Sequence, residues 1–282
     1  MTDSAASQTD QDPSDMLSWL LPIARAAGQS IWSIYERASG HPAGRQSALV
    51  HHKTDQSPLT EADLAAHQTI VAGLQTHAPE IPLISEESYV PEQMLDVGER
   101  FWLVDPLDGT KEFLSGTGEF TVNIALIEQG KAVLGVVYQP NSDELFYGGQ
   151  ALGAYRQVGG QSKQAISVRP RDQAPWRVLA SRSHMGPQTK SLIQRIGSVE
   201  LMQAGSSLKF CRIAMGLADF YPRLGFTSQW DTAAAQAVLE GAGGHVIDSL
   251  GQPLRYGQAD IINPYFLASA LPYELVKPWW RV

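Results

Sequence analysis

The sequence is poor in cysteine, in positive charge and in long apolar segments, and each shortage argues against a class of protein. A single cysteine, Cys211, stands among 282 residues, so no internal disulfide can form and a reducing compartment is expected. The net charge of −8 argues against a nucleic-acid-binding surface, which needs a basic patch. A phosphorylated substrate remains compatible with this charge, because bound divalent metals can reverse the local sign of a site.

The chain also lacks any segment that is long and apolar enough for a transmembrane helix. Residues 1–14 are polar and acidic and have no basic start, so they predict a flexible tail and not a secretory signal. These features favour a cytoplasmic protein. What is present suits a globular fold, since 43% hydrophobic and 18% charged residues allow a sizeable core.

Apolar periodicity divides the rest of the chain into two regions, with a boundary near Pro170. Residues 15–169 predict an α+β domain, in which two helices are followed by short strands that indicate an antiparallel meander. Residues 170–282 alternate strand-like and helix-like segments, which predicts an α/β domain. Residues 38–52 are expected to form a loop. The predicted helices span 15–37, 60–77, 187–196, 205–216 and 231–241.

The most informative stretch is Asp-Pro-Leu-Asp-Gly-Thr at 105–110. It follows an apolar run, which predicts that its acids lie where a buried strand ends at Val104 and a turn begins. Such a turn can aim the carboxylates of Asp105 and Asp108 at one point, with the Leu107 carbonyl between them. Three oxygens arranged in this way suit Mg²⁺. Taken alone, the stretch is as consistent with a surface turn, since Asp, Pro and Gly are common turn formers.

Other acids follow the same pattern. Glu86 stands at the end of a short apolar strand and would converge with Asp105 if the two strands were neighbours. Asp231 stands at the start of an Ala-rich helix, where it could bind a metal or serve as an N-cap. Asp63 follows Thr60 at the spacing of a capping box, which accounts for it without a metal. The alternative, that Asp63 reaches a metal, stays open.

Anion-binding positions accompany the acids. Gly109 lets backbone N–H groups approach a phosphate, and a helix that starts there would favour one. A second predicted helix start carries Ser206 and Lys209. Arg182 follows a predicted strand; it could pair with a phosphate or be an ordinary surface arginine.

Three motifs, in this order, resemble the inositol monophosphatase-like family of lithium-sensitive, Mg²⁺-dependent phosphatases. They are Ser85-Glu86-Glu87-Ser88, residues 105–110, and Trp230-Asp231-Thr232-Ala233. The inositol phosphatases usually carry Thr-Asn where this chain has Lys111-Glu112. Lys111-Glu112 and the stretches 118–126 and 205–211 are similar to the bacterial CysQ-type 3′(2′),5′-bisphosphate nucleotidases.

The resemblance implies a layered α-β-α-β-α sugar-phosphatase fold and a Mg²⁺-dependent activity. The implied reaction is hydrolysis of the 3′-phosphate of adenosine 3′,5′-bisphosphate (PAP), giving AMP and phosphate. Two alternatives stay open, namely an inositol or sugar monophosphatase of the same fold and a nucleotide-binding regulator that has lost turnover. Family members occur as monomers and as dimers, and some lie at the cytoplasmic face of the inner membrane.

The resemblance also implies roles for individual residues. One Mg²⁺ would be held by Glu86, Asp105 and the Leu107 carbonyl, a second by Asp105, Asp108 and Asp231, and a weaker third would lie near Asp63. Glu86 and Thr110, together with Asp63, form the implied catalytic set that orients and deprotonates the attacking water. The residues expected at the substrate are Glu86, Leu107, Asp108, Gly109, Thr110, Lys111, Arg182, Ser206, Lys209 and Asp231.

Overall fold

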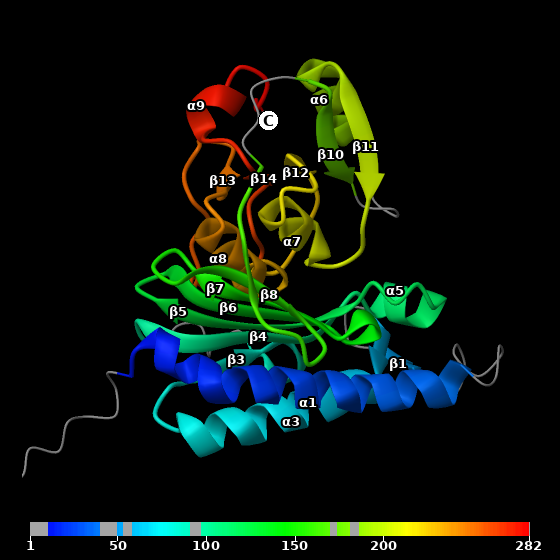
Figure 1. The fold of residues 1–282 in the computed structure, drawn as a ribbon, viewed down its shortest axis with the longest axis vertical. Coiled ribbons are helices and arrows are strands. Elements are labelled where there is room, and N and C mark those ends of the chain that lie inside the picture. Colours follow the sequence, from blue (N-terminus) through cyan, green and yellow to red (C-terminus); the bar gives the residue numbers. More distant parts are fainter. Residues whose placement is uncertain are drawn as a thin grey trace, which may run out of the picture.

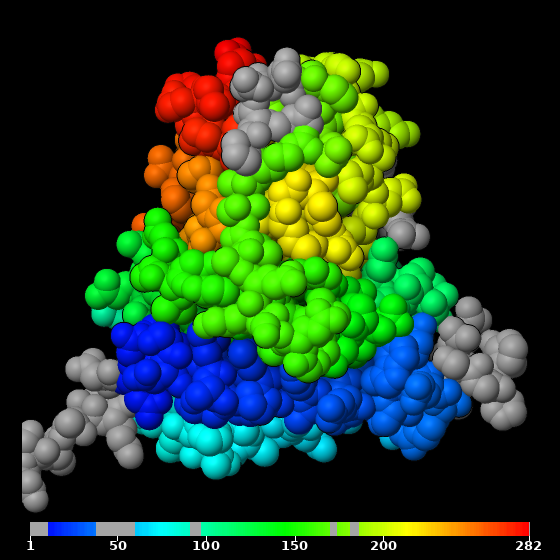
Figure 2. Space-filling view, viewed as in Figure 1, coloured from blue at the N-terminus to red at the C-terminus, as the bar shows by residue number. Residues whose placement is uncertain are grey.

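Helices and sheets alternate in layers through the molecule (Figure 1). The computed structural model describes residues 11–39, 50–52, 58–90, 97–169, 174–180 and 186–281. Two helices form the base, a seven-stranded sheet lies on them, further helices cover the other face of that sheet, and a five-stranded sheet with outer helices completes the stack. Figure 2 shows the same order from outside, with the blue and cyan helices at the bottom and the yellow-to-red segments at the top.

The base layer consists of α1, Pro13–Ser39, and α3, Glu61–His77, which pack side by side. Both are predicted helices, and their buried apolar residues face the large sheet. The predicted capping box is present at the start of α3. The Thr60 hydroxyl accepts a hydrogen bond from the N–H of Ala62, and the carboxylate of Asp63 accepts one from the N–H of Thr60. Helix α1 begins inside the stretch predicted to be a flexible tail.

The seven-stranded sheet contains the predicted meander. Its spatial order follows the chain, from β3 to β9; β3 pairs with β4 in parallel, and every later neighbour is antiparallel. The strands are β3 Leu83–Ser85, β4 Arg100–Asp108, β5 Thr121–Glu128, β6 Lys131–Gln139, β7 Glu144–Gly149, β8 Gly153–Val158 and β9 Gln164–Ile166.

The second region forms a five-stranded sheet in the order β11-β10-β12-β14-β13. Strand β10 is parallel to β11 and β12, whereas β14 is antiparallel to both of its neighbours. The strands are β10 Trp176–Ala180, β11 Val199–Gln203, β12 Phe220–Arg223, β13 His245–Asp248 and β14 Phe266–Ser269. The helices are α6 Pro187–Ile196, α7 Leu208–Ala214, α8 Ala233–Gly241 and α9 Tyr273–Val276.

Short elements complete the chain. Strands β1, Val50–His52, and β2, Pro58–Thr60, form a two-stranded antiparallel ribbon before α3. The remaining short helices are η2 Glu86–Ser88, α5 Thr110–Ser115, η3 Pro140–Ser142 and η4 Gln229–Asp231. No helix in the described part of the chain combines the length and apolar character needed to cross a membrane.

Three hydrophobic cores hold the layers together. The lower core joins α1 and α3 to the large sheet, the middle core places α7 and α8 between the two sheets, and the upper core seats α6 and α9 on the small sheet. Cys211 is fully buried in the middle core, and burial raises the pKa of its thiol, so it packs as a small apolar residue. Trp280 is buried in the upper core, and its indole donates to the Asp248 carbonyl.

The structure corrects the prediction at several element ends. Strand β4 runs through Asp108 and does not end at Val104, because a bulge lets it resume pairing with β5. The loop predicted for 38–52 ends in β1. The helix predicted for 205–216 is only α7, because the backbone before it bends to donate hydrogen bonds to two carboxylates.

Other differences lie near the C-terminal half. Asp231 belongs to η4, and α8 starts two residues later, at Ala233. The apolar periodicity of the sequence predicted neither β14 nor α9. Residues 1–10 of the predicted tail, the boundary at Pro170, and Arg182 lie outside the described residues.

The close contact between α8 and β6 gives a test of this layering. A Cβ at Gly135 would lie 2.0 Å from the carbonyl oxygen of Ala234, a backbone atom that cannot rotate away. We expect Gly135→Ala to lower the free energy of unfolding by about 1–3 kcal/mol, the usual cost of overpacking. Urea unfolding should show this loss, whereas Gly160→Ala, with nothing within 4 Å of the new methyl group, should stay near wild type. Equal stability of both variants would contradict the packing.

Candidate active site

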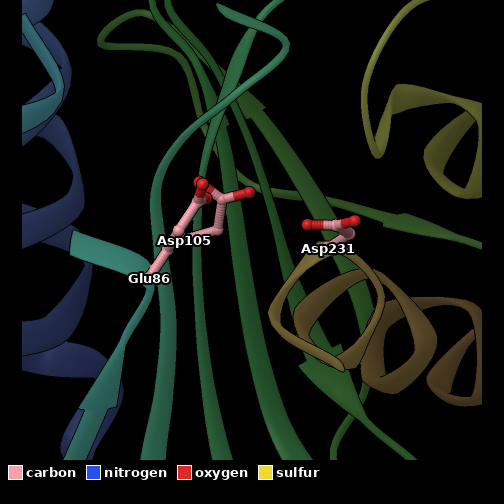
Figure 3. A group of neighbouring side chains, drawn as sticks. All are labelled: Glu86, Asp105 and Asp231. Atoms are coloured by element: carbon pink, nitrogen blue, oxygen red, sulfur yellow. The ribbon is translucent and has the colours of Figure 1, made fainter. Parts of the chain in front are cut away.

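Three carboxylates from separate parts of the chain meet between the two regions (Figure 3). Glu86, Asp105 and Asp231 each offer an oxygen, and these oxygens all lie within 4.8 Å of one another. Asp105 is 1% exposed, whereas the other two are half-buried. The predicted convergence of Glu86 with Asp105 is confirmed, and Asp231 faces them from the opposite side. We call these three residues the acidic cluster.

The local structure explains how each member of the acidic cluster is positioned. Strand β3 pairs in parallel with β4, with Ser85 opposite Val104, so the next residue on each strand leaves the same edge. Asp105 is followed by a bulge, since β4 takes three steps from Asp105 to Asp108 while β5 takes two. A bulge of this kind bends the strand and redirects side chains. Asp231 comes from η4, just before α8 packs against the large sheet.

Burial makes the acidic cluster electrostatically costly without a cation. Burial, and then the negative charges of Glu86, Asp108 and Asp231, raise the pKa of Asp105 well above its ordinary value. Burial, Asp108 and Glu86 do the same to the pKa of Asp231, against the opposing effects of a backbone N–H and Arg223. Hard oxygen ligands with mutual repulsion are the donor set that suits a divalent cation.

Asp108 is held in place by hydrogen bonds of its own. Its carboxylate accepts a 2.6 Å hydrogen bond from the N–H of Ser207 and a longer one, 3.4 Å, from the side-chain amide of Asn123. Burial raises its pKa to about 6, although the positive charge of Lys209 opposes the rise. The second predicted helix start was expected to bind an anion; its Ser207 N–H instead donates to a carboxylate of the chain itself.

Asp63 forms the predicted capping box and also contacts a residue of the site. One carboxylate oxygen caps α3, and the other accepts a 3.4 Å hydrogen bond from the hydroxyl of Thr110. The same hydroxyl lies 3.4 Å from the carbonyl oxygen of Leu107. Asp63 is 2% exposed, and its negative charge contributes to the raised pKa of Asp105. The cap thus places a buried carboxylate beside the site.

The turn at Gly109 brings backbone N–H groups to the site. Gly109 has φ +93°, a left-handed conformation that glycine adopts without strain, and it is the N-cap of α5. A side chain here would also be crowded, since a Cβ would lie 3.2 Å from the Glu119 carbonyl oxygen and 3.3 Å from Ser206. Among the described residues, no hydrogen bond uses the N–H of Gly109 or Thr110.

A small pocket of about 140 Å³ lies beside the acidic cluster and shares Asp231 with it. The predicted substrate residues Lys111, Ser206 and Lys209 line this pocket. Lys209 is buried, and its ammonium group donates to the carbonyl oxygens of Ser206 and Ala204. Burial lowers the pKa of Lys209 to about 8, against the opposing charge of Asp108.

Sequence reasoning missed the residues that anchor the acids. Asn123 and Ser207 fix Asp108, and the Ser207 hydroxyl also donates to Asn123. Ser228 donates its N–H to Asp231, in a capping box whose two partners are three positions apart. The Ser228–Asp231 spacing was a readable signal, of the kind used for Thr60 and Asp63. No local pattern pairs residues 123 and 207, because only the tertiary fold brings them together.

Comparison with known proteins identifies the family. The model of the inositol monophosphatase family matches residues 12–276, which is most of the chain. The chain belongs to the inositol monophosphatase family. This family is metal-dependent, and the acidic cluster is a group of carboxylates that could hold a metal ion.

Several named proteins resemble this chain along nearly their whole length. The 3′(2′),5′-bisphosphate nucleotidase CysQ of Salmonella typhimurium is 44% identical over 252 residues, which are 89% of this chain and 98% of that protein. The protein of the same name from Buchnera aphidicola is 42% identical over 259 residues, 91% of this chain and 94% of its own. The crystal structure of CysQ from Bacteroides thetaiotaomicron matches with a TM-score of 0.78 at 36% identity, covering 90% of this chain and 97% of that one. The predicted layered fold is therefore confirmed.

The raised pKa of Asp105 gives a test that needs no activity. An acid whose pKa is raised by folding stabilises the fold only while it is protonated, so its contribution is lost as pH rises through the folded pKa. In chelator at pH 8, Asp105→Asn should therefore raise the free energy of unfolding by about 0.5–2 kcal/mol, as when a strained functional site is relieved. This gain in the free energy of unfolding should shrink as pH falls toward about 4, because the wild-type carboxyl group then becomes protonated and uncharged.

Urea unfolding at the two pH values measures this effect. Asp15→Asn, which changes an exposed aspartate, is the matched control and should shift stability by less than about 0.5 kcal/mol at either pH. A loss of stability in metal-free Asp105→Asn at pH 8 would show that the buried carboxylate is already compensated by the fold.

Proposed function

We propose that this protein is a Mg²⁺-dependent 3′(2′),5′-bisphosphate nucleotidase that hydrolyses the 3′-phosphate of adenosine 3′,5′-bisphosphate to give AMP and phosphate. The observation that carries the proposal is the 44% identity to a protein named as such a nucleotidase, over 98% of that protein's length. The arrangement of acids at the site supports it, since phosphoryl transfer needs positioning and charge neutralisation and little covalent chemistry from the protein. The lone, buried Cys211 suits a reducing compartment such as the cytoplasm.

The donor set fits divalent cations. Glu86, Asp105 and the Leu107 carbonyl would hold one Mg²⁺, and Asp105, Asp108 and Asp231 a second, with Asp63 near a third. When bound, the ions would neutralise the repulsion among the acids and stabilise negative charge on the phosphoryl group. The backbone N–H groups of Leu107, Ser207 and Ser228 hold the carboxylates in place before any ion arrives, which supports a prearranged site.

The chain's own groups can orient and activate the attacking water. Because Asp63 accepts a hydrogen bond from the Thr110 hydroxyl, the Thr110 oxygen keeps its lone pairs for a proton of the water. Glu86, a member of the acidic cluster, would accept the other proton of this water as a general base. The N–H groups of Gly109 and Thr110 would bind the oxygens of the scissile phosphate.

Phosphate release from adenosine 3′,5′-bisphosphate is the direct test of the activity. We expect fast release that depends on Mg²⁺ and stops in chelator, and much slower release from inositol 1-phosphate under the same conditions. Release mainly from the inositol ester would favour the inositol monophosphatase alternative. Tight nucleotide binding without phosphate release in saturating Mg²⁺ would favour a regulatory protein without turnover.

The shared carboxylate gives a second test. Asp105→Asn should lower kcat by a few orders of magnitude, because it removes a charged oxygen ligand that two cations would share. Steady-state kinetics at saturating Mg²⁺ measure this loss. Glu80→Gln, which neutralises an exposed acid on the loop after α3, should keep the wild-type rate. Near-normal turnover by Asp105→Asn would remove the two-metal proposal.

A further inference from the structure

Asp231 reaches the acidic cluster from an element that is weak by itself. Helix η4 consists of only three residues, Gln229–Asp231, and a single helical turn is unstable without tertiary contacts, because its nucleation is costly. Its carboxylate also faces those of Glu86 and Asp105, with oxygens within 4.8 Å of one another, and like charges at such distances repel. Contacts from another part of the chain must therefore hold Asp231 in place.

An irregular segment, residues 256–263, runs along η4 and supplies these contacts; we call it the supporting loop. At its start, the N–H of Tyr256 donates a 3.0 Å hydrogen bond to the carbonyl of Gly130, in the turn between β5 and β6. The side chain of Tyr256 is buried in the middle core. At its other end the loop leads into β14 of the small sheet. The loop is thus anchored to both sheets, and it can set the position of η4 relative to Asp105 on the large sheet.

Gln229, the first residue of η4, is tied to this loop by its side chain and its backbone. The side chain is 1% exposed, and its Nε2 donates to the carbonyls of Asp260 and Gln258, at 2.7 and 3.3 Å. Its Oε1 accepts a 2.8 Å hydrogen bond from the N–H of Gly257. The backbone N–H of Gln229 donates to the carbonyl of Ile261 at 2.8 Å. Such a connected network of buried hydrogen bonds makes the backbone of η4 rigid.

Asn263, the last residue of the supporting loop, contacts both flanks of η4. Its Nδ2 donates to the carbonyl of Ser228 at 2.7 Å and to the hydroxyl of Thr232 at 3.0 Å, and the residue is 6% exposed. Its backbone N–H donates to the carbonyl of Thr227. The N–H of Ser228, in turn, donates to the carboxylate of Asp231. One buried amide therefore fixes the residues before and after the acid.

We propose that Gln229 and Asn263 are positioning residues, which hold Asp231 toward Asp105 through the supporting loop and so set the affinity of the cation that Asp231 would bind. The inference rests on the proposed function, because that function places a Mg²⁺ at Asp231. Buried amides are normally paired, which accounts for the presence of partners. It does not account for the gathering of both sets of partners around one metal-ligating acid. Residues that orient a ligand from outside commonly decide metal affinity.

Metal binding to the substrate-free protein tests the inference without turnover. We titrate Mn²⁺, an oxygen-seeking ion that electron paramagnetic resonance detects, into the wild type, Asn263→Ala and Gln229→Ala. Asp231→Asn identifies the binding step that needs Asp231. Each of the two alanine variants should raise the Kd of that step by about 10- to 100-fold and leave the other step within about two-fold. Half-saturating Mg²⁺ for phosphate release should rise by a similar factor, and kcat should recover at high Mg²⁺.

A double variant separates positioning from general stability. Asp231→Asn combined with Asn263→Ala should bind Mn²⁺ as Asp231→Asn does alone, because no ligand then remains to be positioned. Urea unfolding checks that each protein is folded. If Asn263→Ala does not fold, Gln229→Ala carries the test, since the carbonyls it releases belong to exposed residues, Gln258 and Asp260, where water can replace the amide.

Gln236→Leu is the matched control. It removes another buried amide, 2% exposed, whose side chain bonds to Tyr256, Leu254 and Glu240. We expect a lower urea midpoint, because the hydroxyl of Tyr256 and the carbonyl of Leu254 lose a partner, and an Mn²⁺ affinity within about two-fold of the wild type.

The outcomes separate the inference from the proposed function. If the wild type binds no Mn²⁺, or Asp231→Asn weakens no binding step, the proposed metal ligands are wrong and the inference falls with them. If the wild type binds Mn²⁺ and hydrolyses the nucleotide while both alanine variants keep its affinity, the function stands and the inference is wrong. Equal weakening of both binding steps, or an equal loss in Gln236→Leu, would assign the effect to general destabilisation and overturn the inference.

Discussion

Mutual repulsion among buried carboxylates is the constraint on which the rest of the structure depends. Asp105 is almost fully buried and lies within reach of Glu86 and Asp231, with Asp63 and Asp108 close enough to raise its pKa further. In the unfolded chain these carboxylates would repel one another and stay apart. The packing of the three hydrophobic cores holds them together, because the lower core fixes α3 and β4 while the middle core fixes α8 against the same sheet. The free energy of burying apolar surface therefore offsets the electrostatic strain until a cation binds.

Four acids of the site share one local feature. The carboxylates of Asp63, Asp105, Asp108 and Asp231 each accept a hydrogen bond from a backbone N–H, those of Thr60, Leu107, Ser207 and Ser228 respectively. A backbone donor stabilises the charged form and fixes the side-chain rotamer, while the carboxylate keeps lone pairs for another partner. Two of the four use a capping box, so a common helix-start motif also orients a functional group. The structural and functional explanations of Asp63 and Asp231 are therefore compatible.

Negative and positive side chains occupy different parts of the site. Acids gather where β3, β4 and η4 meet, and the basic groups Lys111, Lys209 and Arg223 face the adjoining pocket. The overall charge of −8 conceals this arrangement, because a net charge says nothing of where the charges lie.

Much of the secondary structure, and the identity of the clustered acids, could be predicted from the sequence alone. Helical and alternating apolar periods located α1, α3, α6 and the antiparallel meander, because those periods are local properties of the chain. The strand ends predicted at Ser85 and Val104 indicated that Glu86 and Asp105 would meet if the two strands were neighbours, and β3 and β4 are parallel neighbours. The bulge after Asp105, the short α7, and the contacts of Asn123 and Ser207 with Asp108 could not be predicted in this way. Each of these depends on a contact between segments distant in the chain, such as Ser207 with Asp108, and no local pattern encodes which distant group a backbone N–H will reach.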